Sequence, residues 1–173
     1  MFYKFKNNNG FTLAEMMIVI AIIGIFSSLT IINFRGQAKV RELNSQALLL
    51  LDGLKRMQTS SLTGQMVAGE VPTAYLFEIN DCPSDCFYSL RAETALGGEI
   101  DIDNVLLTKS IIDLLTGNNL LIKITPPRSN IEIDLDGAPL TSVEIILKHL
   151  NDPSITKKIK INGISGRMDI ISP

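Results

Sequence analysis

The sequence predicts an α+β protein in which one long N-terminal α-helix packs on an antiparallel β-sheet. Helical periodicity runs from Phe11 to about Ser61 without a proline, whereas the rest of the chain consists of short alternating segments separated by turn residues. Because such short connections favour antiparallel pairing over crossovers, we expect an antiparallel sheet. At 173 residues, the chain fits one ordinary globular domain in addition to the helix.

The first half of the predicted helix is apolar. Residues 11–34 contain a single charged side chain, Glu15. A run of about 18 or more apolar residues is long enough to span a hydrocarbon core of about 30 Å. A chain segment in lipid must also satisfy its own backbone hydrogen bonds, which favours a helix. We therefore predict that residues 11–34 are the transmembrane half of the helix.

Residues 35–62 are predicted to form the amphipathic half of the same helix. Apolar side chains recur there at alternating spacings of three and four, which is typical of a helix with one side packed on a sheet. The members of this stripe are Val40, Leu43, Ala47, Leu50, Leu54 and Met57. A coiled coil is the alternative, but the run is shorter than three heptads. Thr63-Gly64 is predicted to end the helix.

Residues 63–173 are predicted to form a β-rich globular domain. Several segments alternate apolar with polar residues, the signature of a half-buried strand. The predicted strands cover residues 73–79, 87–91, 120–125, 131–135, 143–147, 157–161 and 168–171. Turns are predicted at residues 136–139 and 151–154 and at Asn162-Gly163, and residues 93–117 give no clear pattern.

Residues 1–10 form a polar leader that differs from an ordinary secretory signal. Lys4 and Lys6 supply positive charge, and the small residue Gly10 precedes the apolar segment instead of following it. Cleavage after Gly10 would leave the apolar helix on the mature protein and create an α-amino group at Phe11. That cation would suit Glu15, whose carboxylate is costly deep in a membrane. A position of Glu15 near the membrane interface, where the cost is small, is the alternative.

This order of features resembles the class III leader of type IV prepilins and pseudopilins. The matching residues are Lys4, Lys6, Gly10 and the run Phe11-Thr-Leu-Ala-Glu15, followed by the apolar segment. The resemblance implies a pilin-like fold, cleavage after Gly10 by a prepilin peptidase and N-methylation of Phe11. It also implies assembly through the N-terminal helix, with Glu15 neutralised by the Phe11 amine of a neighbour. Ala14 departs from the family, which usually has a larger aliphatic residue there.

The sequence Ile164-Ser-Gly-Arg-Met168 is similar to the Gly-Arg ending of the GspH/FimT group of minor pilins. This likeness implies a minor pilin or pseudopilin subunit of a type IV pilus or of a type II secretion pseudopilus. The implied location is the cytoplasmic membrane, crossed once, with an extracytoplasmic C-terminal domain, and then a cell-surface or periplasmic fibre. The alternative is a single-span membrane-anchored binding module that does not polymerise.

The partners implied by the resemblance are the prepilin peptidase, other pilins or pseudopilins, an inner-membrane assembly platform and membrane lipid. Nucleic acid is not expected as a partner, because the chain has 16 basic against 18 acidic residues and no basic footprint. No arrangement of catalytic side chains and no phosphate-binding loop is present in the sequence. We therefore expect a protein that is not an enzyme and that needs no cofactor.

Cys82 and Cys86 are the only cysteines of the chain, and His149 is its only histidine. Two cysteines do not make a zinc site, which needs four ligands, and the histidine is predicted to lie in a different strand. The cysteine spacing also differs from the CxxC of redox proteins. If the domain is exported, a structural disulfide is predicted. A free thiol pair and a metal site are the alternatives.

Two charged patterns allow a solvated and a functional interpretation. Glu99, Asp101 and Asp103 alternate with apolar residues, which places their carboxylates on one strand face. Such a face is commonly solvated, although carboxylate oxygens are also calcium ligands. Lys157, Lys158 and Lys160 form a basic patch without aromatic residues, predicted to be a solvated edge strand, with DNA contact as the alternative.

Overall fold

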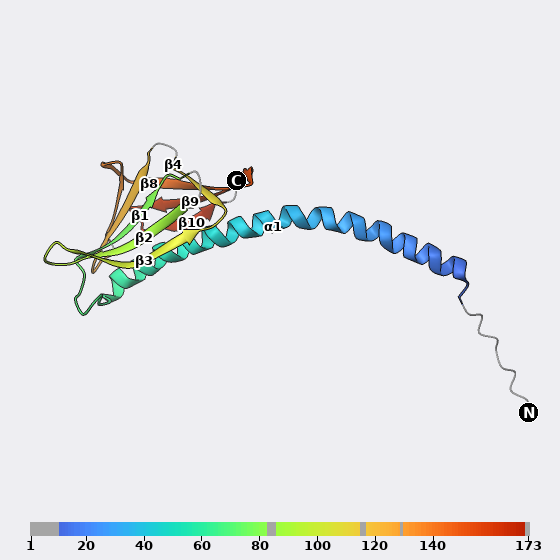
Figure 1. Cartoon of the computed structure of the whole chain (residues 1–173). Helices are drawn as coiled ribbons and strands as arrows, with labels where there is room; N and C mark the ends of the chain where they lie inside the picture. Colours follow the sequence, from blue (N-terminus) through green and yellow to red (C-terminus); the bar gives the residue numbers. More distant parts are fainter. Residues whose placement is uncertain (1–10, 83–85, 115–116, 129, 172–173) are drawn as a thin grey trace, which may run out of the picture. The chain divides into compact units, whose positions relative to one another are not determined.

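The computed structural model describes residues 11–82, 86–114, 117–128 and 130–171, and within the helix the side chains of residues 28–36 lie outside this description. The chain divides into two units with the boundary between Ala38 and Lys39. One helix, α1 (Leu13–Thr63), runs through both units (Figure 1). The contacts discussed below for the globular part all lie within the second unit, residues 39–173.

Helix α1 ends in a Schellman motif. Gly64 follows the last helical residue with a φ of +62°, and the N–H of Gln65 donates to the carbonyl oxygen of Ser60 at 3.0 Å. A residue with positive φ just past the end of a helix is most often glycine, because it has no Cβ to clash. The predicted stop at Thr63-Gly64 is therefore confirmed.

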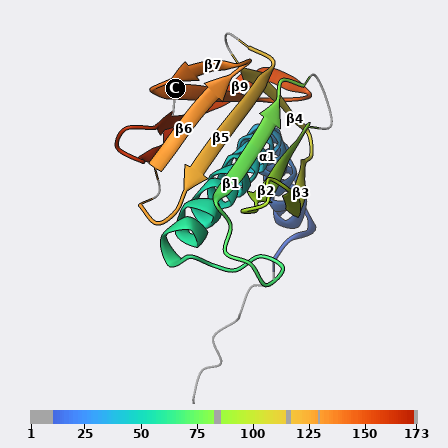
Figure 2. The ribbon, with the colours of Figure 1, turned by 90° about the vertical axis from the view of Figure 1, so that its left-hand side faces the viewer.

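In the part of the chain that the structure describes, ten antiparallel strands form two sheets (Figure 2). The six-stranded sheet has the order β3-β2-β1-β5-β6-β7 and consists of β1 (Ala74–Asn80), β2 (Cys86–Glu93), β3 (Glu99–Leu107), β5 (Asn119–Thr125), β6 (Asn130–Leu135) and β7 (Ala138–Leu140). The four-stranded sheet has the order β10-β9-β8-β4 and consists of β4 (Ser110–Leu114), β8 (Ser142–His149), β9 (Asp152–Asn162) and β10 (Met168–Ile171). All seven predicted strands are present, but the expectation of one sheet was wrong.

The segment that gave no clear pattern, residues 93–117, supplies β3 and β4. Strand β4 does not pair with its neighbour in sequence: Ser110 lies opposite His149 of β8. Alternation along a strand shows that one of its faces is buried, but not which sheet the strand joins. Strand β7 lies where only a turn was predicted, because Asp136 and Gly137, with φ values of +52° and +84°, complete the turn in two residues.

Helix α1 and both sheets contribute to one hydrophobic core. Five of the six predicted stripe residues are buried, with exposures of 0–2%: Leu43, Ala47, Leu50, Leu54 and Met57. Val40 was assigned wrongly, since 38% of it is exposed. The sheets meet this stripe with buried side chains such as Phe77, Ile122 and Ile145.

Tyr88 of β2 packs directly on the backbone of α1 at Gly53. A Cβ atom at position 53 would lie 2.8 Å from Cε2 of Tyr88, closer than van der Waals contact allows. The Tyr88 hydroxyl donates to the carbonyl oxygen of Leu49 at 3.1 Å. Burial, followed by the nearby carboxylates of Asp103 and Asp52, raises the pKa of Tyr88 to about 12. Gly53 therefore permits a close approach between helix and sheet.

The lysines of β9 correct one prediction. Strand β9 lies between β10 and β8 and is not an edge strand. Lys158 and Lys160 both approach the carboxylate of Glu144 on β8, at 4.0 and 3.9 Å. The basic patch is therefore part of a cross-strand charge cluster on the face of the four-stranded sheet.

Candidate processing and assembly site

The start of helix α1 is held by a capping box between Thr12 and Glu15. The Thr12 hydroxyl accepts a hydrogen bond from the backbone N–H of Glu15 at 3.2 Å. In return, the Glu15 carboxylate accepts from the backbone N–H and from the hydroxyl of Thr12, at 2.8 and 2.9 Å. These bonds satisfy backbone donors that have no partner inside a helix. The helix accordingly begins at Leu13.

Glu15 thus has a partner within its own chain, which our interpretation of the sequence did not include. The spacing of Thr12 and Glu15 is the Ser/Thr-x-x-Glu signal that precedes an apolar helix, so the sequence did contain it. Phe11 lies just before this motif and is 83% exposed. Lys4, Lys6 and Gly10, and with them the predicted cleavage site and leader, lie outside the described residues.

Comparison with known families bears on this same segment. Residues 5–31 match the model of the prokaryotic N-terminal methylation motif. The match supports a class III leader of the type IV pilin kind and indicates a precursor of the pilin or pseudopilin type. Such a precursor is processed by a prepilin peptidase, is anchored in a membrane and carries an extracytoplasmic domain. No curated protein and no solved structure gave a significant match to the chain.

The motif covers part of the predicted transmembrane segment, residues 11–34. This segment is helical from Leu13 onward, and its large side chains from Leu13 to Phe26 are mostly exposed in the isolated chain. Among the residues that the structure describes, no helix was found that is long and apolar enough to cross a membrane. The side chains of residues 28–34 do not belong to that description.

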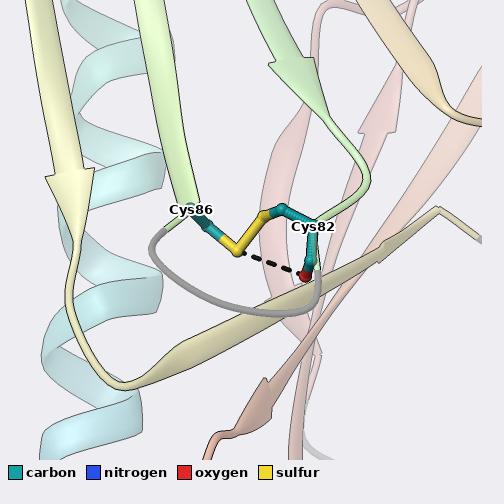
Figure 3. The surroundings of a disulfide bond; sticks show 2 residues. All are labelled: Cys82 and Cys86. Atoms are coloured by element: carbon teal, nitrogen blue, oxygen red, sulfur yellow. Dashed lines mark hydrogen bonds between the residues drawn. A yellow bond between two sulfur atoms is a disulfide. The ribbon is translucent and has the colours of Figure 1, made fainter.

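Cys82 and Cys86 form a disulfide, with their Cα atoms 5.6 Å apart (Figure 3). Cys86 begins β2 of the six-stranded sheet, whereas Cys82 forms an isolated antiparallel β-bridge with Ile112 of β4. In that bridge, each backbone N–H donates to the other residue's carbonyl oxygen at 3.3 Å. The disulfide therefore joins β2 to a segment that pairs with a strand of the other sheet.

Thiol labelling checks this bond in the protein itself. In the unfolded, non-reduced protein, neither Cys82 nor Cys86 is expected to react with a maleimide, whereas both should react after reduction. Exported domains commonly carry such bonds, because oxidising compartments preserve them. Quantitative labelling of both cysteines without a reductant would contradict the disulfide and weaken the case for export.

The prediction that the acidic residues of β3 share one face was wrong. A register shift places Asp101 opposite Arg91 and Asp103 opposite Leu90, and these neighbouring residues of β2 point to opposite faces of the sheet. The carboxylate of Glu99 pairs with Arg91 at 2.6 Å, and that of Asp103 with Arg56 of α1 at 3.5 Å. Over the described ranges, no group of three or more potential metal-ligating side chains occurs. These contacts agree with the interpretation of β3 as a partly solvated strand.

The Gly-Arg sequence lies in the connection between β9 and β10. Gly166 has a φ of +68°, and its carbonyl oxygen accepts a hydrogen bond from Nε2 of Gln58 in α1 at 3.2 Å. Arg167 forms an ion pair with Asp169. The segment thus connects the last two strands and also contacts the helix, so its positive-φ glycine has a structural reason.

Proposed function

We propose that this chain is a minor pilin or pseudopilin subunit, similar to the GspH/FimT group, that is cleaved after Gly10 and assembled through helix α1. The observation that carries the proposal is the match of residues 5–31 to the N-terminal methylation motif. The polar leader and the charged residue in an otherwise apolar segment agree with it. The fibre would belong to a type IV pilus or to a type II secretion pseudopilus.

The mechanism is assembly, and the protein has no enzymatic activity of its own. A prepilin peptidase cuts the Gly10–Phe11 bond and methylates the new amine of Phe11. Residues 11–34 then hold the subunit in the cytoplasmic membrane, with residues 63–173 as the extracytoplasmic domain. An inner-membrane platform transfers the subunit into a fibre whose centre is a bundle of such helices.

Glu15 has two tasks in this proposal. In the single chain its carboxylate caps the helix through Thr12. In the fibre it also receives the Phe11 amine of a neighbouring subunit. A carboxylate has two oxygens with about four acceptor positions, so it can serve both donors. A charge left unpaired between packed apolar helices costs several kcal/mol, so this pairing would help to set the register between subunits.

Mass spectrometry of the native protein tests the processing step. The mature chain is expected to begin at Phe11 and to be heavier than the unmodified chain by one methyl group. Gly10→Val should abolish cleavage, because a branched side chain crowds the scissile bond. Asn8→Val is the matched control, since it places the same side chain in the leader two residues away and should be cleaved normally.

An intact Met1 terminus in a cell with an active prepilin peptidase would contradict the proposal. It would favour the membrane-anchored binding module that does not polymerise, because a plain anchor needs no cleavage at Gly10. Equal cleavage of the Gly10→Val and Asn8→Val variants would show that the peptidase does not depend on the small residue at position 10.

A further inference from the structure

The first turn of α1 inside the second unit is attached to the sheets by ion pairs. Lys39, the first residue of that unit, contacts the Asp152 carboxylate at 3.0 Å. One turn later, the Glu42 carboxylate contacts Nζ of Lys109 at 2.8 Å. Lys109 lies in the turn between β3 and β4, and Asp152 begins β9. Two separate turns of the globular unit therefore hold one turn of the helix.

His149 contacts Glu42 and lies opposite Asp152 in the register of β8 and β9. It is 2% exposed, and its Nε2 lies 3.4 Å from the Glu42 carboxylate. Its Nδ1 accepts a hydrogen bond from the backbone N–H of Asn151 at 3.2 Å. In the tautomer whose Nδ1 accepts this hydrogen bond, the imidazole N–H is on Nε2 and faces the Glu42 carboxylate. The backbone N–H of Leu150 also donates to the carbonyl oxygen of Lys109 at 2.8 Å.

The surroundings of these side chains are polar compared with the rest of the helix interface. Between Lys39 and Gln46, Leu43 is the only buried apolar side chain of α1. Gln46 is itself buried, and Ser110, which lies opposite His149 in the strand register, is fully buried. From Ala47 onward the interface is mainly apolar. The attachment of residues 39–46 of α1 to the sheets therefore depends more on pairing between polar side chains than on apolar burial.

The backbone conformation of Lys109 indicates that its side chain has a role in this contact. Its φ is +57°, a conformation in which glycine or asparagine is usual and a lysine is uncommon. Glycine or asparagine would therefore adopt the backbone conformation of this turn with less strain. What lysine adds is the ammonium group that reaches Glu42.

We propose that five residues form a latch that holds residues 39–47 of α1 on the globular unit. They are Lys39, Glu42, Lys109, His149 and Asp152. Opening the latch releases residues 39–47 of the helix, while the strands and the helix beyond Ala47 stay packed. Local opening of this kind requires a segment with few buried apolar contacts, which describes these turns. The latch thus decides how much of the helix belongs rigidly to the globular domain. The inference does not depend on the proposed function.

The latch is expected to weaken in acid. A hydrogen bond from Lys109 lowers the pKa of Glu42, and hydrogen bonds from Ser154 and Lys39 lower that of Asp152. A carboxyl group whose pKa is depressed on folding contributes stability above its ordinary pKa, and this contribution is lost as the pH falls through the folded value. The other charged or titratable groups here, Lys39, Lys109 and His149, come from α1, the β3–β4 turn and β8.

Hydrogen exchange of the full chain in detergent, followed by mass spectrometry, tests the proposal. Glu42→Gln should accelerate amide exchange in residues 39–47 by about tenfold and leave β1 and β5 unchanged, because only the local opening becomes easier. Arg41→Gln is the matched control, since it removes an exposed charge from the adjacent position and should exchange like the wild type. In the wild type, the same acceleration should appear below about pH 4, after correction for the intrinsic pH dependence of exchange.

A charge exchange keeps the test sharp if a single variant unfolds. Lys39→Asp alone should accelerate exchange in residues 39–47, and adding Asp152→Lys should restore it to the wild-type rate. Equal exchange of these helix residues in the wild type, Glu42→Gln and Lys39→Asp would overturn the latch. Uniform acceleration over the whole globular unit would overturn it as well, because the five residues would then support global stability only.

Discussion

Glu15→Gln is expected to reduce incorporation into the fibre strongly while leaving the start of the helix intact. Glutamine still completes a capping box with Thr12, but it cannot neutralise the Phe11 amine of a neighbour. Leaving one partner of a buried charge pair alone costs about 3–5 kcal/mol, which corresponds to a loss of much more than tenfold. The measurement compares the amount of protein in sheared-fibre and membrane-extracted fractions.

Two further variants separate pairing from capping. Thr12→Ala removes the cap but keeps the charge, so it should cost about 1 kcal/mol of helix stability and allow assembly. Glu15→Ala removes both the charge and the carboxylate half of the capping box, and should assemble as poorly as Glu15→Gln. Cleavage after Gly10 should continue in all three variants. If Glu15→Gln is incorporated like the wild type while Thr12→Ala is not, capping is the role of Glu15 and the proposed pairing is wrong.

Gly53→Ala is expected to destabilise the globular unit, although alanine is the better helix former. The helix preference alone would favour alanine by up to about 1 kcal/mol. The added Cβ, however, would lie 2.8–3.0 Å from two ring atoms and the hydroxyl oxygen of Tyr88, whose side chain is buried and hydrogen-bonded to α1. Overpacking of this kind costs about 1–3 kcal/mol, so the net effect should be a loss of stability. Denaturant unfolding followed by circular dichroism measures it.

Gly24 provides the matched control, since a Cβ there meets no atom within 4 Å. Gly24→Ala should therefore be neutral or slightly stabilising. A second substitution tests the cause. Because Tyr88→Leu removes the ring, Gly53→Ala should lower the free energy of unfolding much less in the Tyr88→Leu background than in the wild type. Equal costs of Gly53→Ala with and without the ring would show that the close approach at Tyr88 is not the reason.

The sequence predicted the elements of the fold better than their arrangement. The second half of helix α1 was predictable because its apolar stripe, from Leu43 to Met57, repeats with the helical period. The end of the helix was predictable because Gly64 follows it. Strand β6 was predictable because Ile131 and Ile133 alternate with acidic residues. The second sheet was not, because the pairing of β4 with β8 depends on residues such as Ser110 and His149 that are distant in the chain.

The candidate site shows the same division between local and distant contacts. The leader and the Thr12–Glu15 cap are local patterns, and the first of them was recognised from the sequence alone. The latch joins Glu42 to Lys109 and His149 across many residues, and nothing in the sequence near any of them indicates the others. The bridge between Cys82 and Ile112 was hidden for the same reason.

That bridge bears on the order in which an exported chain folds. A domain that leaves the membrane after its N-terminal anchor presents Cys82, Cys86 and β4 well before β8. Strand β4 then has no partner in its own sheet, and an unpaired edge is prone to join another chain. The disulfide holds Cys82 next to Cys86 at the start of β2, and both cysteines precede β4 in the chain. If the chain is exported, this bond can form before β8 has emerged, so the segment that bridges to β4 is tied to β2 before β4 gains its strand partner.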